Sequence, residues 1–419
     1  MLTALANAFK IPDLRRKILF TLMILGLYRV GAHVPAPGID IEKVQAAVQE
    51  SAALGLLNLF SGGALENVAV FALGIMPYIT SSIIMQLLQG VIPKLEQWAK
   101  EGETGQRKIT QLTRYMTLGI GLMQSIALIA FFRDALRFTP ADGAAYTVTF
   151  AVIIITMLAG VALIMWMGEL ITQRGIGNGM SLIIFASIVA RFPSAIIGSL
   201  QIASPLLVLL LVPVFLFIVV SIVTMERGQR RIPVQYAKRV VGRRVYGGTG
   251  TYIPLKVNGA NVIPIIFASA ILFFPAQIAQ MTGVAALERV ATSLTAGWPY
   301  FVFQAALIIF FTYFYTALVF NPIDLADNLR KNGGFIPGVR PGKATVTYIE
   351  NVINRITLPG AIFLAAIAVA PTLLFRLTNV PGLQEFGGTS ILIMVGVSLE
   401  TMRQLESQLQ MRHYEGFFK

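Results

Sequence analysis

Ten long apolar runs alternate with polar segments along the chain. A helix needs about 20 apolar residues to cross a hydrocarbon core of about 30 Å. Because the backbone must satisfy its own hydrogen bonds in lipid, we expect these runs to be helices. The pattern therefore predicts an all-α polytopic membrane protein with ten transmembrane helices. The runs lie at roughly Ile18–Val34, Val68–Ile92, Leu112–Phe132, Val148–Leu170, Met180–Ile202, Leu206–Met225, Ala260–Met281, Trp298–Phe320, Ile356–Phe375 and Gly388–Leu405.

Glycine and proline interrupt some of these runs. The second run contains Gly74-Ile75-Met76-Pro77, the fifth follows Gly175–Gly179 and contains Pro193, and the tenth starts at Gly387-Gly388. Broken helices in matching halves mark a central site in many membrane folds. We therefore expect two pseudo-symmetric halves of five helices in an inverted repeat, at residues 1–203 and 204–419. The large polar loops of the second half are residues 226–258 and 321–355.

One further apolar stretch, Ala53–Leu59, is too short to cross a membrane and precedes Ser61-Gly62-Gly63. We interpret residues 53–67 as an interfacial or re-entrant half helix. Because this segment is short and rich in glycine, we expect few contacts to hold it and its local stability to be low.

The composition excludes several classes of function. It is 56% hydrophobic and 13% charged, with mean hydropathy +0.72 and no Cys. A soluble domain would carry about a quarter charged residues, so we expect no sizeable soluble domain. The absence of Cys excludes disulfides and thiol catalysis. His33 and His413 are isolated, and no nucleophile–base pair stands out. We predict no enzymatic activity, no cofactor and no metal site.

Lys and Arg are distributed unevenly between the connections. Twenty-six of the 33 lie in the N-terminus, the even-numbered loops and the C-terminal tail. Since these residues stay in the cytoplasm during membrane insertion, the asymmetry predicts that both termini are cytoplasmic. The formal net charge of +13 also favours attraction to anionic lipid.

The loop after the sixth run combines many cations with aromatic residues. Eight Lys and Arg lie within about thirty residues, interleaved with Tyr236, Tyr246 and Tyr252. One interpretation is a loop that only fixes topology. The other is a surface that docks on a phosphate-rich or acidic partner such as RNA. Charge alone does not decide between them.

The polar residues inside the apolar runs are neutral. An ion-coupled transporter usually needs a carboxylate or another ionisable relay near the middle of the membrane. No Asp or Glu lies there in this assignment. This absence argues against ion-coupled transport and favours a passive channel. A secondary transporter of a small amphipathic solute is the alternative, which a carboxylate in the middle of the membrane would have favoured.

Nine segments of the chain, in order, resemble the bacterial SecY family. The similarity runs from about Leu14 to Tyr414 and is highly specific because so many motifs keep their order. The segments are Phe71–Ile79, Glu101–Ile109, Glu169–Gly179, Glu226–Ile232, Gly242–Tyr246, Phe314–Pro322, Ala326–Leu329, Phe335–Gly342 and Gly387–Ser390.

The resemblance implies a protein-conducting channel that passes unfolded secretory polypeptides and releases transmembrane segments sideways into lipid. It implies a constriction ring, in which Met180 stands where the family usually has a branched aliphatic residue. The half helix resembles the plug of that family. The implied ring is Ile75, Ile79, Met180, Ile184, Ile266 and Ile393, and the implied plug residues are Asn58, Phe60, Ser61, Gly62 and Gly63.

Further positions and partners follow from the same resemblance. Thr80 and Gln124 correspond to polar positions that line a lateral gate. Implied partners are small subunits resembling SecE and SecG, the SecA motor ATPase, the ribosome, and signal peptides with their nascent chains. The implied location is the cytoplasmic (inner) membrane. Residues implied in docking the motor or the ribosome are Lys238, Arg239, Arg243, Arg244 and Arg340.

Overall fold

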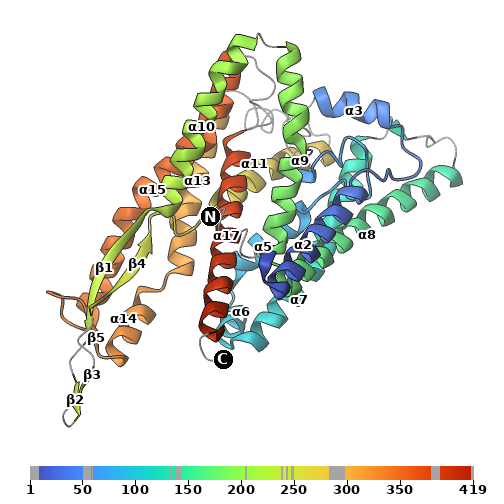
Figure 1. Cartoon of the computed structure of the whole chain (residues 1–419). Helices are drawn as coiled ribbons and strands as arrows, with labels where there is room; N and C mark the ends of the chain where they lie inside the picture. Colours follow the sequence, from blue (N-terminus) through green and yellow to red (C-terminus); the bar gives the residue numbers. More distant parts are fainter. Residues whose placement is uncertain are drawn as a thin grey trace.

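The computed structural model is mostly helical (Figure 1). It describes residues 9–50, 58, 60–132, 135–136, 143–202, 205–236, 239–241, 244–246, 250–282, 298–378 and 387–416. Each of the ten predicted runs contains a helix. These are α2 (Pro12–Gly31), α5 (Met76–Gln89), α7 (Glu103–Phe131), α8 (Ala144–Arg174), α9 (Gly179–Ile202), α10 (Pro205–Arg227), α11 (Ile263–Thr282), α13 (Trp298–Val319), α15 (Lys343–Thr378) and α17 (Gly388–Gly416).

Four helical segments in the described residues are long and apolar enough to cross a membrane. They are Glu103–Phe131, Ala144–Arg174, Trp298–Lys331 and Lys343–Leu374. A membrane crossing by all ten helices stays a prediction, as does the division into two inverted halves at residues 203 and 204.

The predicted second span is wrong at its start. Residues before α5 form a series of turns, Gly74 has φ +54°, and Pro77 lies in the first turn of the helix. Proline is compatible with a helix start, where its missing N–H is not needed, but not with the continuation of a preceding helix. The helix therefore begins only at Met76 and has 14 residues.

The expectation of an all-α fold is also wrong. Two small sheets lie in the cytoplasmic loops predicted from the sequence: one has the order β4-β1-β5 and the other pairs β2 with β3. The antiparallel register runs from Gln229↔Lys256 to Val234↔Thr251. Alternation explains the strand, because Ile232 and Val234 are buried whereas their neighbours in the strand are exposed. The strands are β1 (Gln229–Tyr236), β2 (Arg239–Val241), β3 (Arg244–Tyr246), β4 (Thr251–Lys256) and β5 (Gly334–Phe335).

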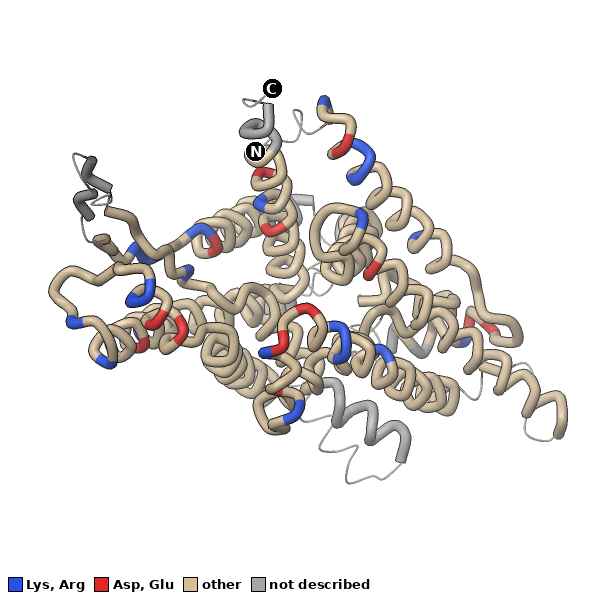
Figure 2. The backbone as a smooth tube through the Cα atoms, turned by 90° about the horizontal axis from the view of Figure 1, so that it is seen from below, with Lys and Arg blue, Asp and Glu red and all other residues tan. Residues whose placement is uncertain are grey.

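The cation-rich connections gather at one end of the molecule. In Figure 1 the lower end carries α6 (Pro93–Lys100), α14 (Pro322–Lys331) and the strands, whereas α3 (Ile41–Glu50) lies at the opposite end. Figure 2, a view from below, shows Lys and Arg at helix ends and in connecting segments. This grouping agrees with the charge asymmetry of the sequence, and we call this end the cation-rich end.

The start of α2 and the end of α17 lie together at this end. Leu14 on α2 packs with Leu405 and Leu409 on α17 and with Ile176 in the turn before α9. Lys17 Nζ also donates to Gln408 Oε1 at 3.4 Å. Both ends of the described chain are therefore on the same face, and their orientation toward the cytoplasm stays a prediction.

The main hydrophobic core joins residues from the two parts of the sequence. It contains side chains of α5 and α9 together with side chains of α11, α13, α15 and α17. Helix α11 contacts α5 and α7, and α17 contacts α9. A second cluster at the end that carries α3 combines Val44, Leu65, Val68, Leu128 and Ile153. The candidate ring residues belong to the main core, and candidate plug residues belong to both clusters.

Candidate pore and plug

The six predicted ring residues come together in the main core, and we call them the pore ring. Ile75 and Ile79 lie one turn apart at the start of α5, and Met180 and Ile184 do so at the start of α9. This i, i+4 spacing places each pair on one helix face. Ile266 on α11 is half-buried, whereas the other five members are buried: Ile75, Ile79, Met180, Ile184 and Ile393. Four helices thus contribute to one apolar cluster.

Close approach of α8 and α9 positions Met180. A Cβ added to Gly179 would lie 1.9 Å from the carbonyl oxygen of Gly168, so glycine is required for this contact. A Cβ added to Gly168 would lie 2.4 Å from Met180 Sδ. Asn178 caps the start of α9, since its Oδ1 accepts from the backbone N–H of Met180 at 3.1 Å. Gly168 therefore provides the space that Met180 occupies.

A cavity of about 400 Å³ leads from the pore ring toward the cation-rich end. Ile79, Met180, Ile184 and Ile266 form its apolar end. Helix α11 also lines the cavity with Ile263 and Phe267, which are apolar. The polar lining residues come from α5, α7, α8 and the start of α9, and they are Tyr78, Ser82, Gln86, Thr110, Arg114, Glu169, Thr172, Gln173, Asn178 and Ser181. The cavity thus has an apolar wall on α11 and polar groups on the helices that face it.

One ion pair fixes the polar wall. Arg114 Nε donates to Glu169 Oε1 at 2.7 Å, and Arg114 Nη2 donates to Glu169 Oε2 at 2.6 Å. Such a two-pronged pair holds both side chains in one geometry. The pair joins α7 to α8 beside the cavity. In the described residues, no ion pair joins α11 to either helix.

Thr80 and Gln124, the predicted gate positions, are not among the residues that line this cavity. Thr80 is half-buried and donates to the Met76 carbonyl at 3.0 Å, and Gln124 is buried on α7. The cavity wall on α5 includes Ser82 and Gln86, which sequence reasoning did not select. Their i, i+4 spacing after Tyr78 marks a polar stripe on an apolar helix and could have identified them.

The candidate plug segment, which we define as residue 58 and residues 60–67, packs into the same core as the pore ring. Phe60 and Ala64 belong to the same apolar cluster as the ring, and Leu65 belongs to the second cluster. Asn58, Ser61 and Gly62 are buried and Gly63 is half-buried. The expectation of few contacts is wrong for these residues, because side chains of α2 and α9 bond to them. Residues 53–57 and 59 of the predicted half helix lie outside the described residues.

Among the predicted docking residues, only Arg340 has a described side chain. It is exposed in a loop turned by Gly338 and Gly342, which have φ of +82° and +106°. Thr345 Oγ1 donates to the Arg340 carbonyl at 2.9 Å and fixes the loop. Strands β1 and β4 form a hairpin, and β5 pairs with Gln235 and Tyr236 at the end of β1 that is farther from α10. Arg239 and Arg244 begin β2 and β3, whereas Lys238 and Arg243 lie outside the described residues.

A buried carboxylate anchors the hairpin to α17. Burial raises the pKa of Glu226 above its ordinary value, although the Asn258 hydrogen bond and the charges of Arg403 and Lys256 oppose this shift. Arg403 Nη2 also donates to the backbone carbonyl of Glu226 at 2.7 Å. These contacts connect α10, the start of α11 and α17 at the cation-rich end.

In the described part of the chain, no cluster of three or more His, Asp or Glu side chains could hold a metal ion. The site consists of an apolar ring, a polar cavity and a plug segment.

Comparison with known proteins assigns this arrangement to a family. A family model described as SecY matches residues 69–402. The protein translocase subunit SecY of Streptomyces scabiei is 50% identical over 440 residues, which cover 100% of both chains. The same fold occurs in a SecY structure whose plug domain stabilises the closed state of the translocation channel and maintains a membrane seal. That structure has a TM-score of 0.63 and 18% identity, and the alignment covers 93% of this chain and 91% of that chain.

A second solved structure with this fold is Sec61 in the canine ribosome-channel complex from the endoplasmic reticulum. Its TM-score is 0.62 at 16% identity, and the alignment covers 93% of this chain and 91% of that chain. The fold is therefore shared with a channel of the canine endoplasmic reticulum.

Proposed function

The chain belongs to the SecY family and is a protein-conducting channel of a translocase, and we propose that unfolded secretory polypeptides cross it through the pore ring. The observation that carries this proposal is the cavity that ends at four of the six ring residues. A narrow apolar constriction excludes water and ions by dewetting. Its flexible aliphatic side chains can separate around a peptide and close after it has passed.

We propose that transmembrane segments leave the same cavity sideways. Helix α11 contacts α5 and α7 along one wall of the cavity. The Arg114–Glu169 pair joins α7 to α8 and therefore keeps this side together when α11 separates. Apolar segments exposed to lipid through such an opening would partition out of the channel, whereas polar segments would continue. Thr80 and Gln124 remain proposed members of this lateral gate.

Partner proteins supply the driving force for translocation. We propose that a SecA-like motor ATPase or a translating ribosome drives polypeptides into the channel from the cation-rich end, where Arg340 is exposed. The structure of Sec61 in a ribosome-channel complex supports the second partner. Small subunits like SecE and SecG would cover apolar helix surfaces, and anionic lipid would contact the cationic loops. The expected location is the cytoplasmic membrane, with both termini in the cytoplasm.

The test is reconstitution of the purified chain with its small subunits and motor in proteoliposomes. We expect ATP-dependent protection of a secretory preprotein from added protease. Because the chain has no Cys, single cysteines at Ser82 and Ile266 can also be cross-linked to a cysteine in the arrested preprotein. Cross-links at a lipid-facing control, Leu216→Cys, but not at Ser82 or Ile266 would contradict passage through the ring.

Gly168 provides a prediction about the fit of the ring. Gly168→Ala places a methyl group where Met180 Sδ lies, and we expect Met180 to move toward the cavity and loosen the seal. Overpacking of this kind costs about 1–3 kcal/mol, and the flexible Met side chain keeps the cost at the low end. Ion conductance of the closed channel in planar bilayers should rise several-fold.

Two further variants check this explanation. Met180→Val in the Gly168→Ala background removes the clashing atoms and should return the conductance to that of Met180→Val alone. Gly119→Ala is the matched control, because a Cβ there meets nothing within 4 Å. Equal leakage in Gly119→Ala and Gly168→Ala would show that Gly168 has no special relation to the ring.

A further inference from the structure

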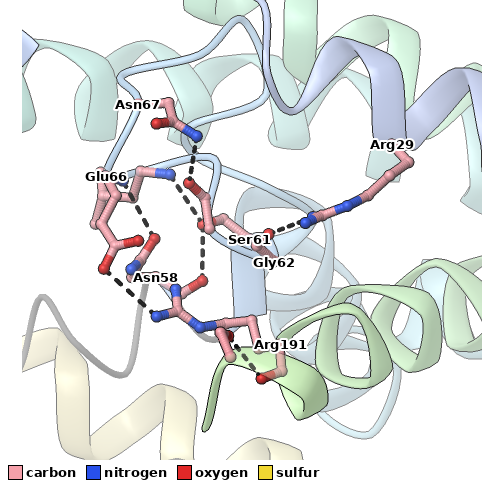
Figure 3. Close-up of polar contacts among 10 residues, drawn as sticks. Arg29, Asn58, Ser61, Gly62, Glu66, Asn67 and Arg191 are labelled. Carbon is pink, nitrogen blue, oxygen red and sulfur yellow. Dashed lines mark hydrogen bonds and ion pairs between the residues drawn. The ribbon is translucent and has the colours of Figure 1, made fainter. Parts of the chain in front are cut away.

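Two arginines lie far from the cation-rich end, inside or beside predicted membrane spans. Arg29 is near the end of α2, and Arg191 lies in the second half of α9. Ionisable side chains at such positions are costly and therefore tend to have a function. Figure 3 shows both side chains reaching the plug segment from different directions.

Helix α2 provides the first contact. Arg29 Nη1 donates a short hydrogen bond to the carbonyl of Gly62. The preceding residue, Tyr28, is buried and stacks on Phe71 at 5.6 Å between ring centroids. Its hydroxyl donates to the Ser61 carbonyl at 3.2 Å and lies 2.7 Å from Ser187 Oγ on α9. Two successive side chains of α2 thus bind two successive carbonyls of the plug segment.

Helix α9 provides the second contact. Arg191 Nη2 lies 3.4 Å from Glu66 Oε1 and forms an ion pair with it. Arg191 follows Ser187 by four residues, so both are on the face of α9 that meets the plug segment. Gly62 has φ +68°, and a Cβ there would lie 3.0 Å from Ser187 Cα. Glycine therefore allows the segment to lie directly on α9.

The plug segment is also bonded internally. The Asn58 carbonyl accepts from Gly63 N–H at 3.0 Å and from Ser61 Oγ at 3.1 Å. Asn58 Oδ1 accepts from Glu66 N–H at 3.2 Å. These bonds lie within the segment and can persist when it moves as one body. The contacts with Tyr28, Arg29 and Arg191 cannot.

We propose that Arg29 and Arg191 form a two-armed latch that holds the plug segment closed against α2 and α9. The proposal rests on the proposed sealing role of this segment, and both arginines are positioning residues that act through it. Charge-assisted hydrogen bonds are about twice as strong as neutral ones. Displacement of the segment breaks the Arg29–Gly62 hydrogen bond and the Arg191–Glu66 ion pair. The latch therefore favours the closed state until a polypeptide displaces the plug segment.

The experiment uses the full chain with its small subunits in proteoliposomes. Ala64 is buried, so Ala64→Cys introduces a single cysteine that reports displacement through its reaction with a membrane-impermeant maleimide. Glu66→Gln removes the negative charge that pairs with Arg191 and changes the shape of the side chain little. Arg191→Gln and Arg29→Met each remove one guanidinium group of the latch. We expect labelling and resting conductance to rise about three- to tenfold in each variant. The charge swap Glu66→Arg with Arg191→Glu should return both towards the parent values.

Matched controls separate the latch from the plug itself. Glu42→Gln makes the same chemical change at an exposed position of α3, and should change neither the maleimide labelling nor the resting conductance. Ala32→Cys is equally buried and should stay protected, which shows that the protein remains folded. Deletion of residues 58–64 tests the seal directly. If the deletion raises the resting conductance but the arginine and Glu66 variants change neither conductance nor labelling, the latch is wrong and the sealing role of the segment is supported. If the deletion stays tight, both proposals fail.

Discussion

Replacement of Ile79, Ile184 and Ile393 together by Asn should make the closed channel conduct ions. These residues come from three helices and are buried in one apolar cluster. An unpaired buried amide costs about 1–3 kcal/mol, and water entering the ring would relieve that cost. Wetting removes the barrier that a dry constriction presents to ions. If the barrier falls by only about 1.4 kcal/mol, the rate of ion passage rises tenfold.

The measurement is resting conductance in planar bilayers with the plug segment intact. Because the three positions are tightly packed, the amount of folded protein is measured in parallel by detergent-resistant assembly with the small subunits. The matched control is the triple change of the same residues to Val, which preserves an apolar ring and should stay ion-tight. A folded Asn triple variant that is as tight as the Val variant would show that these residues do not form the constriction.

The helical ranges were accessible from the sequence because each depends on local composition. All ten predicted runs contain a helix, and the cation asymmetry agrees with the grouping of charged connections at one end. The start of α5 was missed although its cause was visible, since Pro77 cannot continue a helix from Val68. Residue type predicts that a break exists, but the residue at which the helix resumes depends on what the turns pack against.

The β-hairpin was missed for a different reason. The alternation of Ile232 and Val234 with Arg231 and Pro233 has the period of a strand. The sequence analysis instead interpreted the cations of this loop as a topology signal or a docking surface. The buried side of the strand is completed by residues distant in sequence, including Leu329, Ile336 and Ile349. A short strand with two buried side chains is stable only because these residues cover it, and local pattern does not contain that information.

The contacts of the plug segment were the least accessible. Tyr28 and Ser187 are 159 residues apart, and Arg191 and Glu66 are 125 residues apart. The sequence analysis identified the glycines of this segment but interpreted them as a sign of weak packing. The structure shows that glycine at position 62 allows close packing, because it lets the backbone approach α9.

Arg340→Glu should insert with normal topology but lose most motor- or ribosome-driven translocation. Arg340 is exposed at the cation-rich end, and its loop is held by two glycines with positive φ and by the Thr345 hydrogen bond. A fixed loop holds the Arg340 backbone in one place, and the planar fork of its guanidinium can bind a carboxylate or backbone acceptors in a way that an ammonium cannot copy. Loss of one partner in a buried charged contact costs about 2–5 kcal/mol, so the rate should fall by more than about tenfold.

Two variants separate docking from topology. Arg340→Lys keeps the charge and should retain only part of the activity. Lys343→Glu reverses a nearby exposed charge at the start of α15 and should translocate close to the parent rate. Topology and preprotein translocation are measured side by side, the first by labelling of single cysteines from each side of the membrane. Full translocation by Arg340→Glu would show that Arg340 does not form a docking contact and that its charge only helps to set membrane topology. Inverted topology would instead show that Arg340 acts during insertion, because a docking contact has no effect on which way the chain enters the membrane.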